Sequence, residues 1–167
     1  MDKALLTHGD LKLYQMKFED IFPFINKLSP ENFLELEQNY QVLPEDFLVS
    51  VLNNQMTHIV KVSEEVVAAC GIIDGFLWTV FSSDIKKHWR KFVKASPNLI
   101  NYYHYFYEDI YCEVWEQNVF VLNWLLHLGF DPIDRNTLEN GNVTVKFVRC
   151  LFDGDDIDCD VSRPVMH

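Results

Sequence analysis

The chain has 167 residues, a length that suits one domain and is short for two. Aromatic residues make up 14% of it and charged residues only 23%, so global disorder is excluded. The 14 lysines and arginines against 25 aspartates and glutamates give a net charge of −11, which disfavours a general role in binding nucleic acid.

Two further classes are disfavoured by the pattern of residues. The longest apolar stretch, Val119–Phe130, is too short to span a bilayer, so we expect no transmembrane segment. The four cysteines, Cys70, Cys112, Cys150 and Cys159, form no CxxC pair, and the histidines form no HxH or HExxH pair. We therefore expect no metal site.

The N-terminal third of the chain predicts one strand followed by helices. Alternating residues predict a strand over Leu11–Lys17. Apolar residues at helical spacing then predict a helix over Phe18–Leu28, which its internal proline interrupts or restarts. Ser29 before Pro30 is typical of a helix cap and first turn, and a further helix begins near Pro44.

The middle of the chain changes to strands. The β-branched runs His58–Val62 and Val66–Ile73 predict an antiparallel hairpin, and Phe76–Phe81 predicts a third strand after Gly75. All three runs are too apolar to be half exposed, so we expect them at the centre of a sheet.

Two helical pieces are predicted next. Apolar residues from Ile85 to Val93 recur at helical spacing, and Ser96 before Pro97 predicts the cap and first turn of a second helix. Five basic residues would share one face of the first piece: Lys86, Lys87, Arg90, Lys91 and Lys94. That face is either a solvated exterior or a counter-charge for an anionic ligand or an acidic partner.

The C-terminal third alternates between strands and one helix. Ile110–Trp115 predicts a strand, and Asn118 is a well-placed cap for a buried helix that Gly129 ends. Phe130–Ile133 and Val143–Phe152 predict the last two strands. A shift in the apolar register of the final strand predicts a β-bulge within it.

The order of these elements predicts an α+β fold with a mixed, mostly antiparallel twisted sheet flanked by helices. The helical connection between Phe81 and Ile110 predicts that the two strands it joins are parallel neighbours. We expect a single domain over residues 1–152 and an acidic tail over residues 153–167.

The segment Val114-Trp115-Glu116-Gln117-Asn118 and the ending Leu128-Gly129-Phe130 resemble the closing motif of the GCN5-related N-acetyltransferase superfamily. In that family a strand is followed by an asparagine, a helix, a Leu-Gly-Phe ending and another strand. The spacing of eleven residues from Asn118 to Gly129 matches the family's spacing. The order of elements also fits, so this acetyltransferase-like resemblance covers roughly residues 11–152.

A narrower resemblance concerns Leu77–Asp84, the helix after it, a tyrosine-rich segment, Asn118 and Trp124–Phe130. These stretches are similar to the internal virion protein A family of short-tailed bacteriophages, whose members are small phage proteins tied to virion assembly and genome ejection. The resemblance implies a bacteriophage protein that is located in the host cytoplasm or packaged in the virion. Its partner would be a phage or host protein.

The acetyltransferase resemblance implies acetyl-CoA as a cofactor and a set of residues that bind it: Thr79, Val80, Phe81, Ser82, Ser83, Lys87, Arg90 and Asn118. The strand backbone in this set would pair with the pantetheine arm, and the turn after it would meet the pyrophosphate beside the basic helix. Either Glu113 or Glu116 would act as the general base.

Two departures from the family's pattern weigh against catalysis. The turn that cradles the pyrophosphate is rich in glycine in the family, but here it reads Ser82-Ser83-Asp84-Ile85-Lys86-Lys87-His88 and has no glycine. These side chains would crowd the phosphates, and the carboxylate of Asp84 has the wrong charge for them. The family's tyrosine general acid, seven residues after the asparagine, is Leu125 here, and leucine cannot protonate a thiolate.

We therefore expect a degenerate acetyltransferase-like protein that acts in virion assembly or genome ejection, or by binding another protein. One alternative is an active acyl-CoA-dependent N-acyltransferase that modifies a host protein or a small amine. Another alternative is a host-directed inhibitor that acts through its acidic surface.

Overall fold

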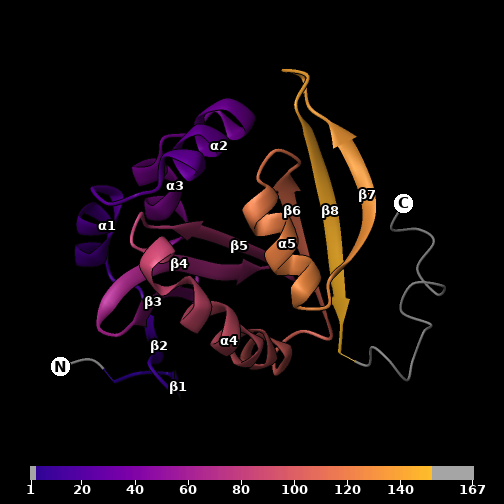
Figure 1. Ribbon diagram of the computed structural model, residues 1–167. Helices are drawn as coiled ribbons and strands as arrows, with labels where there is room; N and C mark the ends of the chain where they lie inside the picture. Colours follow the sequence, from indigo (N-terminus) through magenta and orange to yellow (C-terminus); the bar gives the residue numbers. More distant parts are fainter. Residues whose placement is uncertain (1–2, 152–167) are drawn as a thin grey trace.

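The β-branched runs in the middle of the chain form the centre of an eight-stranded sheet in the computed structural model, which describes residues 3–151 (Figure 1). The strand order is β1-β2-β3-β4-β5-β6-β8-β7. The strands are β1 Leu6–His8, β2 Leu11–Gln15, β3 Thr57–Val62, β4 Glu65–Ile73, β5 Phe76–Phe81, β6 Asp109–Trp115, β7 Asp131–Thr137 and β8 Val143–Cys150. Within the described residues all neighbours are antiparallel except β5 and β6, which confirms the predicted mixed α+β sheet.

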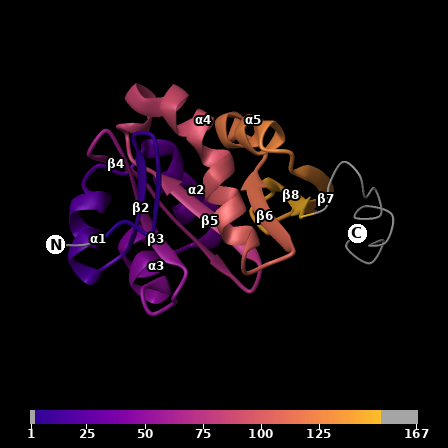
Figure 2. The ribbon, with the colours of Figure 1, turned by 90° about the horizontal axis from the view of Figure 1, so that it is seen from below.

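Helices cover both faces of this sheet (Figure 2). They are α1 Phe18–Ile25, α2 Pro30–Tyr40, α3 Pro44–Val51, α4 Ile85–His104 and α5 Val119–His127. Apolar residues of α1, α2 and α3 pack on one face of the sheet, and those of α4 and α5 pack on the other. Among residues 3–151, no helix combines the length and the apolar character that crossing a bilayer requires.

The chain forms one helix, α4, where two were predicted. Pro97 lacks the amide hydrogen that would bond the carbonyl of Val93, four residues earlier. Ser96 Oγ donates to this carbonyl at 2.9 Å and replaces the missing donor, and Trp124 Nε1 donates to Ser96 Oγ at 3.0 Å. The prediction of a helix cap at Ser96 is therefore wrong, because its hydroxyl bonds backward and the helix continues.

Other boundaries differ from the predictions at the two edges of the sheet. β8 pairs with β6 without interruption, so the register shift predicted for the last strand is wrong; it lies on β7, between Pro132 and Asp134. The short strand β1 was not predicted at all. The acidic tail, residues 153–167, lies outside the described residues and stays a prediction.

Strands β5 and β6 separate soon after they meet. Within the described part of the chain they pair at one position, Phe76 with Tyr111, where the amide of Tyr111 donates to the carbonyl of Gly75 at 2.8 Å. Beyond this point the two ribbons diverge (Figure 1). Backbone groups on the facing edges therefore need partners from elsewhere in the protein.

A buried polar cluster between the sheet and α4 makes the stability of the fold depend on pH. His58 is 1% exposed, and its Nδ1 lies 2.8 Å from the hydroxyl of Tyr103, which in turn lies 3.3 Å from Cys70 Sγ. Burial lowers the pKa of His58 from 6.5 to about 4. The folded state therefore resists protonation of His58, and stability that is complete above pH 6.5 is lost as the pH falls toward 4.

Lowering the pH from 7 to 5 should reduce the free energy of unfolding through His58 by about 2 kcal/mol, because the unfolded state binds the proton more readily. Urea denaturation of the wild type and of His58→Gln at both pH values measures this term. The glutamine variant should show a pH dependence smaller by that amount. An equal dependence in the two proteins would show that His58 does not titrate as its burial predicts.

Candidate binding site between strands β5 and β6

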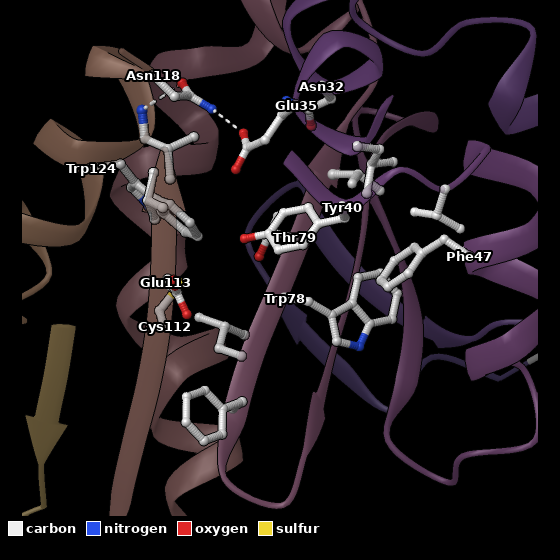
Figure 3. Close-up of a pocket in the computed structure, with 17 residues that line it drawn as sticks. Asn32, Glu35, Tyr40, Phe47, Trp78, Thr79, Cys112, Glu113, Asn118 and Trp124 are labelled. Atoms are coloured by element: carbon white, nitrogen blue, oxygen red, sulfur yellow. Dashed lines mark hydrogen bonds between the residues drawn. The ribbon is translucent and has the colours of Figure 1, made fainter. Parts of the chain in front are cut away.

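The divergence of β5 and β6 creates a pocket of about 310 Å³, which α2 and α3 cover from one side (Figure 3). Residues from five elements and their connections line it: Asn32, Glu35, Leu36, Tyr40, Val42, Phe47, Phe76, Leu77, Trp78, Thr79, Val80, Cys112, Glu113, Val114, Asn118, Val121 and Trp124. A second cavity of about 170 Å³ adjoins it beside the turn from β5 to α4. The two cavities share Asn32, Asn118 and Val121 in their linings.

The N-terminus of α2 is hydrogen-bonded to the C-terminal end of β5. Ser29 caps α2, and its own amide donates to the carbonyl of Phe81 at 3.0 Å. The buried side chain of Asn32 accepts the amide hydrogen of Phe81 through Oδ1 at 2.6 Å. Both backbone groups of Phe81 that face the gap are therefore bonded to α2 and its cap.

The middle of α2 reaches the opposite strand. Glu35 accepts the amide hydrogen of Trp115 at 3.4 Å. It also accepts a hydrogen of Asn118 Nδ2 at 3.1 Å (Figure 3). Burial raises the pKa of Glu35, although both hydrogen bonds oppose that effect. Asn118 also caps α5, because its Oδ1 accepts from the amide of Val121 at 3.4 Å. Its side chain therefore donates to Glu35 through Nδ2 and accepts from α5 through Oδ1.

The C-terminus of α2 is held by the turn between β7 and β8. Asn140 Nδ2 donates to the carbonyl of Gln38 at 2.6 Å, and Asn142 Nδ2 donates to Asn39 Oδ1 at 2.7 Å. Helix α2 is thus bonded to the end of β5, the end of β6 and the β7–β8 turn. Its N-terminal half bridges the two diverging strands.

The turn that follows β5 is also bonded within the protein. The amide of Ser82 donates to Val67 O at 2.9 Å, that of Ser83 donates to Lys27 O at 2.7 Å, and that of Asp84 donates to Ser82 Oγ at 3.2 Å. The carboxylate of Asp84 lies at the start of α4, 3.6 Å from the ammonium of Lys27. These three amides are engaged and are not available to a ligand.

The basic face of α4 is partly neutralised by carboxylates of the protein itself. Lys87 Nζ lies 3.2 Å from Glu65 and 3.4 Å from Asp84, and Lys91 Nζ lies 2.8 Å from Asp10. Arg90 is exposed on the same helix. This arrangement is typical of a solvated helix face. The ion pairs of Lys87 and Lys91 reduce the positive charge that the helix could offer to an anionic ligand.

The two candidate bases lie in different places. Glu113 lines the pocket and accepts a hydrogen bond from the buried hydroxyl of Thr144. Glu116 lies outside the pocket lining and forms an ion pair with Arg135. The structure therefore brings Glu113 together with Thr79, Val80 and Asn118 and places Glu116 elsewhere.

The sequence did not predict the residues of α2 and α3 that face this pocket. Glu35 and Tyr40 lie on α2, and Phe47 of α3 packs edge-on against Trp78 at 5.1 Å between ring centroids. Burial, followed by the nearby carboxylates of Glu35 and Glu113, raises the pKa of the Tyr40 hydroxyl. No local motif marked these residues, because only the fold brings α2 to the gap.

Two polar atoms in this lining could form hydrogen bonds with a ligand. Thr79 Oγ1 and Trp78 Nε1 are buried and have no hydrogen-bond partner within the described part of the chain. Cys112 also lines the pocket, but burial raises the pKa of its thiol to about 12, so it is not a thiolate. Among residues 3–151, no three His, Cys, Asp or Glu side chains are grouped so that they could hold a metal ion.

Comparison with known proteins identifies the fold. No protein-family model and no curated protein sequence matches the chain. A spermidine N-acetyltransferase SpeG chimera from Vibrio cholerae and hSSAT matches with a TM-score of 0.67 at 12% identity, over 86% of this chain and 96% of that chain. A GNAT-family acetyltransferase from Bacillus anthracis matches with a TM-score of 0.64 at 13% identity, over 90% and 98%.

RimL, a ribosomal L7/L12 alpha-N-protein acetyltransferase that is also known in complex with coenzyme A, matches with a TM-score of 0.68 at 9% identity, over 90% and 95% of the two chains. Identities this low establish the fold alone. The chain has the GNAT acetyltransferase fold, as its closing motif predicted. The narrower bacteriophage resemblance stays a prediction.

The residues of this chain do not fit the phosphates of acetyl-CoA. A pyrophosphate at the start of a helix needs free backbone amides, and the amides of Ser82, Ser83 and Asp84 are already bonded. The carboxylate of Asp84 would repel the phosphates. On the strand edge where the pantetheine arm would pair, the amide of Phe81 is already bonded to Asn32. The side chain of Asn118 is already bonded to Glu35.

Gly71 fixes the wall of the pocket that Trp78 forms. A Cβ atom at Gly71 would lie 2.3 Å from the carbonyl of Met56 and 2.9 Å from the indole of Trp78. Gly71→Ala should therefore destabilise the fold by about 1–3 kcal/mol and displace the indole, which tryptophan fluorescence and denaturation can measure.

Gly141→Ala is the matched control, because its added methyl group meets open space. Its only cost is the backbone strain of an alanine at a φ of +88°, about 1 kcal/mol of stability. Wild-type stability and unchanged emission in Gly71→Ala would contradict the role assigned to Gly71.

Proposed function

We propose that this chain is a binding protein that has the acetyltransferase fold but does not use acetyl-CoA. One observation carries the proposal: α2, its cap and the preceding loop already bond the backbone groups of Phe81 and Ser83. A cofactor at the end of β5 would have to displace these bonds. Those of Phe81 are buried, and each buried group left unsatisfied would cost about 1–3 kcal/mol.

The pocket remains as the binding feature under this proposal. Its volume of about 310 Å³ lies at the lower end of the range for small-molecule sites, about 300–1,000 Å³. Aromatic rings from α2, α3 and β5 form its apolar walls, and Glu35 and Glu113 supply polar groups. A small ligand or one side chain of a partner protein fits these dimensions.

The finer assignment rests on the sequence resemblance alone. The similarity of Leu77–Asp84 and Trp124–Phe130 to the internal virion protein A family supports a role in virion assembly or genome ejection, through a phage or host protein. Location in the host cytoplasm or in the virion is part of the same proposal. The net charge of −11 supports the alternative of a host-directed inhibitor.

A second candidate function is acyl transfer to an amine. It is favoured by the presence of a carboxylate, Glu113, and a phenol, Tyr40, in the lining of one pocket. Such a pair can accept and donate protons on the two sides of a reacting group. In this reading the phenol of Tyr40 would take the place of the tyrosine that is Leu125 here.

Titration calorimetry with acetyl-CoA and with free CoA tests the proposal. We expect no binding heat and no thermal shift up to 1 mM ligand, because the phosphate-binding amides are engaged. Micromolar binding that weakens at least tenfold in Lys87→Glu/Arg90→Glu would overturn the proposal. Transfer of acetyl groups to an amine, lost in both Glu113→Gln and Tyr40→Phe, would establish the second candidate function.

A further inference from the structure

Charge is divided between the two layers of helices that cover the sheet. Helices α1, α2 and α3 carry two, three and two acidic residues, and no lysine or arginine. Helix α4, on the opposite face of the sheet with α5, carries five lysines and arginines, and neither helix carries an aspartate or glutamate (Figure 2). The protein therefore presents an acidic layer, α1–α3, and a basic layer, α4–α5.

The basic layer contains a row of charges that the protein itself does not neutralise. Lys86, Arg90 and Lys94 recur every four residues, so they lie along one side of α4. All three are exposed, and none forms an ion pair within residues 3–151, whereas the two other lysines of the helix are paired. The row begins beside α5, because Lys86 and Phe120 line the same cavity.

The acidic layer also has charges without an ionic partner. Glu19 of α1, Glu37 of α2 and Asp46 of α3 are exposed. None of the three forms an ion pair within the described part of the chain. Each layer therefore offers the charges that would complement those of the other.

Exposed apolar side chains accompany the charges on both layers. Phe18 and Phe22 of α1 are 57% and 53% exposed, and their rings pack edge-on with centroids 6.1 Å apart. On the basic layer, Val119 and Leu126 of α5 are 58% and 51% exposed. Apolar groups surrounded by charged ones are typical of surfaces that bind a protein. Burial of these groups would favour a contact, and the charges would set its orientation.

We propose that copies of this chain associate head to tail, with the basic layer of one copy on the acidic layer of the next. A second copy supplies the complementary charge and the apolar groups that each layer needs. A contact between two different faces leaves one face of each kind free, so association can continue beyond a dimer. The inference goes beyond the proposed function, because neither acetyl-CoA nor the pocket takes part in this contact.

The net charge of −11 opposes this association, and screening by salt decides the balance. At an ionic strength of 0.15 M the Debye length is about 8 Å, so repulsion between distant charges is screened more strongly than attraction between charges in contact. At 1 M it is about 3 Å, and the exposed pairs across the contact are weakened as well. Association should therefore be stronger at 0.15 M than at 1 M.

Sedimentation velocity on the full chain, at both salt concentrations and over a series of protein concentrations, tests for association. We expect species larger than a monomer at 0.15 M salt, with a mean size that increases with protein concentration. The apparent Kd should be at least fivefold weaker at 1 M salt.

Two variants with reversed charges locate the contact. Lys86→Glu/Arg90→Glu reverses part of the basic layer, and Glu37→Lys/Asp46→Lys reverses part of the acidic layer. Each variant alone should associate at least tenfold more weakly than the wild type. An equimolar mixture should regain association, because the intact acidic layer of the first variant can contact the intact basic layer of the second. A contact between two identical patches would not be restored by mixing.

Lys3→Glu/Arg135→Glu is the control for net charge. Both residues are exposed and lie outside the helices, and the double substitution changes the net charge from −11 to −15, as Lys86→Glu/Arg90→Glu does. This control should weaken association no more than twofold. Thermal denaturation verifies that each variant is folded, and if one is not, the salt dependence of the wild type and the other variant decide.

A monomer at every salt and protein concentration would overturn the proposal. So would wild-type association in Lys86→Glu/Arg90→Glu, or a mixture of the two variants that fails to associate. The acetyl-CoA titration is independent of these results. Association together with acetyl-CoA binding would keep the head-to-tail contact and refute the proposed function. Absence of both would refute the contact and leave the proposed function standing.

Discussion

The single pairing between β5 and β6 is the constraint on which the rest of the site depends. After Phe76 and Tyr111 the strands diverge, and the polar groups on their facing edges have no strand partner. Buried backbone groups must be bonded, since each one left unpaired costs free energy comparable to a lost hydrogen bond. In this protein α2 supplies much of what is missing, through Asn32 on one side and Glu35 on the other.

This solution determines what the gap can hold. Helix α2 is bonded near its start, its middle and its end, so it lies across the opening as a bridge rather than beside it. The backbone groups of Phe81 and the three amides that follow it are already bonded within the protein, while a pocket lined by aromatic rings and two carboxylates remains. The same fold at 9–13% identity can therefore serve a different chemistry, because function resides in the site and not in the fold.

Local sequence patterns predicted the strands of the sheet well. They did not predict that α2 bridges β5 and β6. The β-branched runs defined β3, β4 and β5, and the cap at Asn118 defined α5. Helix α4 was divided wrongly, because the role of the Ser96 hydroxyl depends on a carbonyl that only the folded helix presents. Glu35 contacts residues 80 and 83 positions away, and no local motif encodes such a contact. Glu113 was found through the family resemblance.

Amide hydrogen exchange at Phe81 and Trp115 tests the bridge most directly. Both amides lie on strand edges that face no strand. We nevertheless expect slow exchange, comparable to that of central β4 amides such as Cys70, because Asn32 and Glu35 accept their hydrogens. Asn32→Ala should release Phe81, and Glu35→Ala should release Trp115, each without affecting the other. Exchange of both amides at unprotected rates in the wild type, with β4 still protected, would contradict the account.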